Sequence, residues 1–125
     1  ERDTLEAERV IWSYSLTEDG LLQTGKTEVP GVPAWLLSAP QLPRCLFAAL
    51  VTDGHMAAFE MVGGQLEPRG SAASGGVNPV HASATEDGRL LLVANYHGPD
   101  GATDSHGASV ASLHIAGDCS LTLAS

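Results

Sequence analysis

The strongest constraint on the fold of this chain is an internal repeat, because the sequence matches itself when it is shifted by 46 positions. The segment that begins at Pro33, P-A-W-L-L-S-A-P-Q-L-P-R-C-L-F-A-A, aligns without a gap with P-V-H-A-S-A-T-E-D-G-R-L-L-L-V-A-N, which begins at Pro79. The match is one of residue type, with a Pro on a Pro, a turn on a turn and C-L-F-A on L-L-V-A. Self-similarity with a period of about 40–50 residues is typical of repeat architectures.

A second pattern recurs in phase with this repeat. Three segments alternate apolar with small or polar residues, turn at Gly or Asp, and resume with Leu: W-S-Y-S-L-T-E-D-G-L-L from Trp12, A-A-F-E-M-V-G-G-Q-L from Ala57 and A-S-L-H-I-A-G-D-C-S-L from Ala111. Alternation with a period of two indicates half-buried β-strands joined by tight turns. Four such strands in each repeat are typical of a propeller blade.

Each repeat therefore predicts four strands in order. We expect first strands at 34–39 and 80–85, turns at 41–44 and 86–89, second strands at 45–50 and 90–95, third strands at 55–61 and 109–115, and outer strands at 65–71 and from 120 onward. The prediction is therefore an all-β chain, a β-propeller fragment of roughly two to three four-stranded blades. Residues 1–125 would form a partial propeller with blade-like units at 10–29, 30–75 and 76–125.

The chain is expected to be a piece of a longer protein. It begins with Glu1 rather than Met and ends inside an alternating apolar pattern. Its 125 residues, of which 43% are hydrophobic, suffice for one domain with a core. Because propeller blades bury their faces against neighbouring blades, a fragment of two or three should expose apolar faces.

The charge balance excludes some classes of partner. Six Lys and Arg residues against fifteen Asp and Glu give a formal net charge of −9, and the basic residues are scattered singly. Nucleic acids and anionic membrane surfaces require a basic patch, so neither is an expected partner. The apolar runs are also too short to span a membrane, since the run from Leu36 to Val51 is interrupted by Pro40, Gln41, Pro43 and Arg44.

Two cysteines, Cys45 and Cys119, lie in apolar surroundings without a C-x-x-C motif. We expect each to be a small, buried, unpaired hydrophobic residue in a protein of a reducing compartment.

Four sequence motifs within these expected blades resemble those of a known family. They are N-P-V-H-A-S (78–83), E-D-G-R-L-L-L-V-A-N-Y (86–96), F-E-M-V-G-G-Q-L (59–66) and L-H-I-A-G-D-C-S-L (113–121). Together they resemble the seven-bladed propeller lactonase family, which includes the propeller-type 6-phosphogluconolactonases and the carboxy-muconate lactonizing enzymes. N-P-x-H followed by D-G-R and V-A-N-Y is the most specific part, since a D-G turn before an apolar strand occurs in every propeller.

The resemblance implies a function for the full-length protein. It implies hydrolysis of a sugar lactone, foremost 6-phosphogluconolactone to 6-phosphogluconate, by a cytoplasmic enzyme that needs no cofactor and no metal and whose partner is the small-molecule lactone. A missing N-terminus leaves room for a targeting peptide. Two alternatives remain: a carboxy-muconate-type lactonizing enzyme, and a non-catalytic propeller that acts as an interaction scaffold.

The candidate site follows from the geometry of a blade. The first strand of a blade lines the central channel, so His81 should point toward the axis at one rim. The second strand runs antiparallel to the first and ends near the same rim, which should bring Asn95 and Tyr96 into one cavity with His81, with Asn78 shaping the same rim. A neutral imidazole can activate water, and amide or hydroxyl groups can bind substrate or stabilise an oxyanion. The alternative is that His81 caps the strand end and that Asn95 and Tyr96 stabilise a loop.

Other polar residues fit this site less well. Arg89 lies in the turn at the far end of the first strand and is expected to be solvated. The remaining histidines have spacings that fit no compact metal motif: His55, His97, His106 and His114. The segment 97–107, H-G-P-D-G-A-T-D-S-H-G, lacks the D-x-D-x-D-G register of a calcium loop, so we expect an insertion or a lid.

Overall fold

The computed structural model describes residues 9–51, 54–97 and 108–124, and within them it contains three antiparallel β-sheets and no helix. The elements in chain order are β1 (Val10–Thr17), β2 (Gly20–Glu28), β3 (Pro33–Ala39), β4 (Leu42–Leu50), β5 (His55–Val62), β6 (Gln65–Ala73), β7 (Val77–Ala84), β8 (Leu90–His97), β9 (Ser109–Ile115) and β10 (Leu121–Leu123). In this part of the chain, therefore, no helix is long and apolar enough to cross a membrane. The all-β prediction is confirmed.

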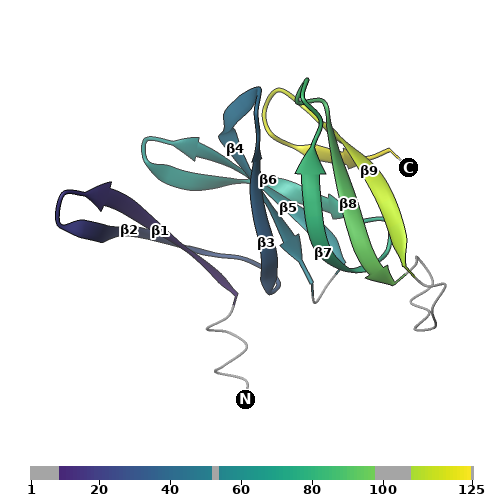
Figure 1. Ribbon diagram of the computed structural model, residues 1–125, viewed down its shortest axis with the longest axis horizontal. Helices are drawn as coiled ribbons and strands as arrows, with labels where there is room; N and C mark the ends of the chain where they lie inside the picture. Colours follow the sequence, from purple (N-terminus) through teal and green to yellow (C-terminus); the bar gives the residue numbers. More distant parts are fainter. Residues whose placement is uncertain (1–8, 52–53, 98–107, 125) are drawn as a thin grey trace, which may run out of the picture.

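The sheets follow the order of the sequence. β1 and β2 form a hairpin, β3-β4-β5-β6 form one four-stranded meander, and β7-β8-β9-β10 form a second (Figure 1). The two meanders correspond to the two copies of the 46-residue repeat, as expected of propeller blades. One boundary differs from the prediction, since the first turn is shorter than 41–44. Leu42 pairs with Ala39, so β4 already begins at Leu42.

The main core lies between the two four-stranded sheets. Phe47 and Met56 from one sheet and Leu91, Val93 and Leu113 from the other are fully buried in a single cluster. Within β8, Leu91 and Val93 alternate with less buried residues, and within β4 Cys45, Phe47 and Ala49 occupy alternate positions, so the cluster lies on one face of each sheet. Sheet-on-sheet packing of this kind is the contact that a propeller repeats from blade to blade.

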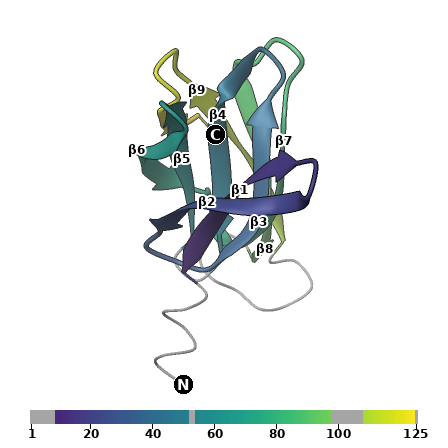
Figure 2. The ribbon, with the colours of Figure 1, turned by 90° about the vertical axis from the view of Figure 1, so that its left-hand side faces the viewer.

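The sheet β3–β6 is covered on both faces. A second cluster on its other face joins Ala48, Leu50 and Phe59 to Ile11 and Val29, which come from the β1–β2 segment. Burial on both sides explains why β4 ends with four consecutive buried residues instead of an alternating pattern. Figure 2 shows the hairpin crossing in front of this sheet.

Other apolar side chains remain exposed on the outer sheets, as expected of a partial propeller. In the hairpin they include Trp12, Tyr14, Leu16, Leu21 and Leu22, and in the last sheet Leu92 and Val110.

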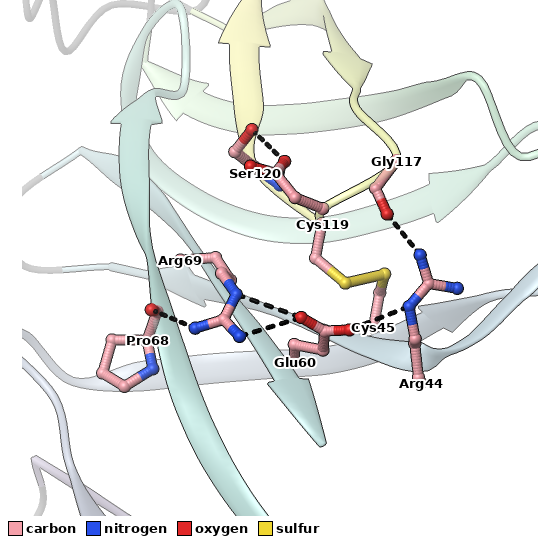
Figure 3. The surroundings of a disulfide bond; sticks show 9 residues. Arg44, Cys45, Glu60, Pro68, Arg69, Gly117, Cys119 and Ser120 are labelled. Atoms are coloured by element: carbon pink, nitrogen blue, oxygen red, sulfur yellow. Dashed lines mark hydrogen bonds and ion pairs between the residues drawn. A yellow bond between two sulfur atoms is a disulfide. The ribbon is translucent and has the colours of Figure 1, made fainter. Parts of the chain in front are cut away.

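The prediction of two unpaired cysteines is wrong, because Cys45 and Cys119 form a disulfide (Figure 3). Both are buried, as expected. Cys45 lies in β4 and Cys119 in the turn between β9 and β10, and sheet packing brings their Cα atoms to 5.4 Å although they are 74 positions apart in sequence. Nothing in the spacing of two cysteines predicts such a long-range pair.

Beside the disulfide, Glu60 binds two arginines. Its Oε2 accepts a hydrogen bond from Arg44 Nε at 2.9 Å, and its Oε1 accepts bonds from Arg69 Nη2 at 2.9 Å and Nε at 3.1 Å (Figure 3). Arg44 also donates from Nη2 to the carbonyl of Gly117, in the turn between β9 and β10. The hydrogen bond from Arg69, followed by the bond from Arg44 and the positive charges of both, lowers the pKa of Glu60 below its ordinary value of 4.5 against the opposing effect of burial.

This ion cluster predicts a pH dependence of stability. A carboxyl group whose pKa is lowered by folding stabilises the protein above its unfolded-state pKa, and this stabilisation is lost as the pH falls from about 4.5 through the folded-state value. Glu60→Gln in the full-length protein should therefore flatten the fall in thermal midpoint below this pH, with the larger difference from wild type near neutral pH. Parallel midpoint curves for the two proteins would contradict the prediction.

Candidate inner-edge site

The candidate site lies where the innermost strands of the two blades meet. β3 and β7 are the first strands of their sheets, each forms an edge, and they lie side by side in both ribbon views (Figures 1 and 2). In a propeller the first strand of each blade is the innermost one. His81 is exposed on β7, the first strand of its sheet, but β7 begins at Val77, so His81 lies in the middle of the strand and not at its start, where the sequence analysis expects it.

A bulge sets the direction of the His81 side chain. The β7–β8 register shifts between Pro79 and His81, so that Pro79 pairs with Asn95 but His81 pairs with Ala94. The β3–β4 register shifts at the equivalent place, between Pro33 and Trp35. Proline has no N–H group to donate to the ladder, which is why strand prolines accompany edges and bulges. A bulge also turns the residue beside it, and bulges recur next to active sites for this reason.

The sequence analysis did not single out Trp35, although the repeat contains the signal for it. Trp35 and His81 are each the third residue of the two matching segments, P-A-W and P-V-H, so they occupy equivalent positions in neighbouring blades. In the structure their rings touch, with centroids 4.3 Å apart and planes tilted by 51°. The Trp35 indole Nε1 also donates a hydrogen bond of 3.1 Å to the carbonyl of Ala82. Trp35 thus fixes one side of the imidazole and joins the blades.

The other three expected residues lie where β7 begins and β8 ends, but they have different surroundings. Asn95 is only 3% exposed, and its Nδ2 donates a 2.8 Å hydrogen bond to the carbonyl of Ser74 in the segment between β6 and β7. Tyr96 is 67% exposed, and the centroid of its ring lies 5.2 Å from the centroid of the His97 ring. Asn78 is half-buried and has a left-handed φ of 58°, a conformation that Asn tolerates better than most residues.

Asn95 and Tyr96 do not share a face of the sheet. Consecutive side chains alternate along a strand, so Tyr96 lies on the face of Ala94 and His81, whereas Asn95 lies on the face of Pro79. Asn95 is therefore placed to hold the connection between the blades, whereas Tyr96 lies on the face of the sheet that carries His81. The Oδ1 atom of Asn95 is buried and has no hydrogen-bond partner among the residues that the structure describes.

The residues that the sequence analysis set aside lie elsewhere. Arg89 is exposed in the turn before β8, where its backbone N–H donates a hydrogen bond to the Asp87 carboxylate. The hydrogen bond from the Thr85 hydroxyl, then that from the Arg89 backbone, lowers the pKa of Asp87. His114 is exposed on β9 and His55 begins β5, whereas His106 and most of the segment 97–107 lie outside the described residues.

His81 does not line the groove beside β1. Within residues 9–51, 54–97 and 108–124, no three His, Cys, Asp or Glu side chains gather to hold a metal ion. A groove of about 390 Å³ lies between β1 and the sheet β3–β6, and its lining includes Trp12, Tyr14, Ser38, Arg44 and Met61. The site at His81 is instead an open edge, which adjoining blades of a complete propeller would enclose.

The contact of Trp35 with the second blade predicts a measurable effect on stability. Trp35→Phe keeps an aromatic ring beside His81 but removes the hydrogen bond to Ala82, so the free energy of unfolding of the full-length protein should fall by about 1 kcal/mol. Trp35→Leu should cost more, because the ring contact is lost as well. Denaturant titration of the three proteins tests this order, and equal stabilities would contradict it.

Asn95 offers a second test, which separates a structural role from substrate binding. Asn95→Ala leaves the buried Ser74 carbonyl without its side-chain donor and should lower the free energy of unfolding by about 1–3 kcal/mol. Tyr96→Phe, the exposed neighbour, is the matched control and should change it by less than about 0.5 kcal/mol. An Asn95→Ala protein that keeps its stability but binds substrate less tightly would instead make Asn95 a substrate ligand.

Comparison with known proteins agrees with this architecture. The family model described as "Lactonase, 7-bladed beta-propeller" matches residues 4–125. No curated protein sequence matches the chain.

Three solved structures share the fold. A "putative 6-phosphogluconolactonase" from Bacteroides fragilis has a TM-score of 0.74 and 18% identity over 94% of this chain and 32% of its own. A protein from Lactobacillus plantarum has a TM-score of 0.74, 18% identity, and coverage of 94% and 35%. A "putative 6-phosphogluconolactonase" from Bacteroides uniformis has a TM-score of 0.74, 14% identity, and coverage of 94% and 34%.

The chain spans about a third of the length of these three proteins. At such low identity the structural likeness establishes the fold, while the family model extends over nearly the whole chain. The two four-stranded meanders and the match to the family model together show that the chain belongs to the seven-bladed β-propeller lactonase family.

Proposed function

We propose that the full-length protein hydrolyses a sugar lactone, and that 6-phosphogluconolactone is its substrate. The observation that carries this proposal is the exposed imidazole of His81 on an innermost strand, held from one side by Trp35. Membership of the lactonase family and the names of two of the similar structures support the reaction class.

In the proposed reaction His81 acts as a general base. Its neutral imidazole accepts a proton from a water molecule while the water oxygen adds to the lactone carbonyl carbon. The ring C–O bond then breaks, and the imidazolium returns the proton to the departing ring oxygen, which leaves the open-chain hydroxy acid. The Tyr96 hydroxyl shares a face with His81 and is the proposed hydrogen-bond partner of the sugar, while Asn78 shapes the same end of β7.

Recognition of a phosphate group is assigned to other parts of the full-length protein. Arg44 and Arg69 already bind Glu60, and Arg89 lies in the turn beyond the far end of β7. Lys26 packs over the ring of Trp12 with its Nζ 5.6 Å from the centroid. These four cations are engaged or placed elsewhere, and we assign the phosphate contacts to other blades of the full-length protein.

The test is the initial rate of lactone loss above spontaneous hydrolysis, measured with the full-length protein. His81→Ala should lower kcat about a hundredfold, the usual effect of losing a general base. His114→Ala is the matched control, since His114 is also an exposed strand histidine but lies on β9, away from the inner edge. Gluconolactone measured beside 6-phosphogluconolactone shows whether the phosphate contributes to KM.

Each alternative result has a meaning. An enzymatic rate that His81→Ala leaves unchanged would refute the role of His81 but not the reaction. A folded protein that gives only the background rate with both lactones would refute the proposed function, and would favour a muconate-type lactone or a non-catalytic scaffold.

A further inference from the structure

The disulfide joins two blades at a point where other contacts already hold them together. Arg44, which precedes Cys45, donates to the carbonyl of Gly117 in the turn that carries Cys119 (Figure 3). The same turn is closed by hydrogen bonds from the Ser120 N–H and hydroxyl groups to Asp118 Oδ1, at 3.0 and 2.6 Å. The Cys119 side chain is thus aimed at Cys45 by the fold itself.

The backbone of Cys119 also indicates that its side chain is required. Cys119 has a φ of 76°, in the left-handed region that is costly for a residue with a Cβ atom. The equivalent outer turns of the other two sheets use glycine for such conformations, Gly20 with a φ of 115° and Gly64 with a φ of 82°. A glycine would remove the strain in this turn, but it could not form the cross-link.

Both cysteines belong to the core between the blades. They are buried in one cluster with Phe47, Met56 and Leu113. They are also the only two cysteines in the chain, so the pairing leaves no thiol unmatched. A buried disulfide is inaccessible to small thiols unless the two sheets separate, so once formed it persists in the folded protein.

We propose that the Cys45–Cys119 disulfide forms in the full-length protein, and that the protein therefore matures in an oxidising compartment. Protein disulfides persist outside the reducing cytosol, where glutathione and thioredoxin systems keep thiols reduced. This location differs from the cytoplasmic one that the family resemblance implies. The proposal rests on the cross-link alone and is independent of the lactonase reaction.

The proposed oxidant is a dithiol–disulfide oxidoreductase of that compartment. The thiolate of one cysteine attacks the oxidoreductase disulfide and forms a mixed disulfide, and the thiolate of the second cysteine then displaces the enzyme. The chain loses two protons and two electrons and gains one S–S bond, while the oxidoreductase disulfide is reduced to a dithiol.

The direct test is thiol trapping in the cells that produce the protein. Cells are quenched in acid, the denatured protein is alkylated with N-ethylmaleimide, and its peptides are analysed by mass spectrometry. We expect Cys45 and Cys119 in one cross-linked peptide pair, and both should accept alkylation only after reduction. Alkylation of both residues without prior reduction would overturn the proposal.

Thermal unfolding provides a second measurement on purified full-length protein. Reductant present throughout heating should lower the midpoint of the wild type by several degrees, and should leave the midpoint of a Cys45→Ala/Cys119→Ala double variant unchanged. An equal response of both proteins to reductant would show that this pair does not cross-link the blades. A lactonase assay does not enter either test, so failure of the proposed function leaves the result intact.

Discussion

The packing of one four-stranded sheet on another is the constraint on which the rest of the structure depends. Each sheet alone leaves an apolar face uncovered, and the contact between Phe47, Met56 and Leu113 removes both faces from water. Once the faces are aligned, the inner edge strands β3 and β7 lie side by side and the turn between β9 and β10 approaches β4. The contact of Trp35 with His81 and the disulfide are both results of this one alignment.

Sequence patterns predicted the repeating part of this fold well. A period of 46 residues and alternating segments identify four strands per unit without knowledge of any long-range contact, since both are local signals. The strand position of His81 followed from the same repeat. What the patterns missed depends on tertiary contacts or local register: the pairing of Cys45 with Cys119, and the opposite facing of Asn95 and Tyr96. Trp35 could be predicted only in part. Its equivalence to His81 is visible in the sequence repeat, whereas the contact between the two rings depends on tertiary packing.

The acidic composition also takes on a different meaning in the structure. The net charge of −9 suggests a surface that repels phosphorylated molecules, and two of the six basic residues, Arg44 and Arg69, are engaged by the single carboxylate of Glu60. These two cations act within and between the blades rather than on a ligand. In such a chain, selectivity for an anionic substrate would depend on the local field within the assembled channel rather than on the net charge.

The disulfide also changes how the blades can unfold. In repeat proteins each unit contacts only its neighbours, so stability is close to a sum of unit and interface contributions, and single units can open independently. A cross-link between residues 74 positions apart removes conformational entropy from the unfolded chain, worth about 4 kcal/mol in the chain-entropy model. It also encloses the connection between the two blades within one covalent loop. The two blades then stay tethered to each other even when one of them opens, so we expect their unfolding to be more strongly coupled than that of blades joined by the chain alone.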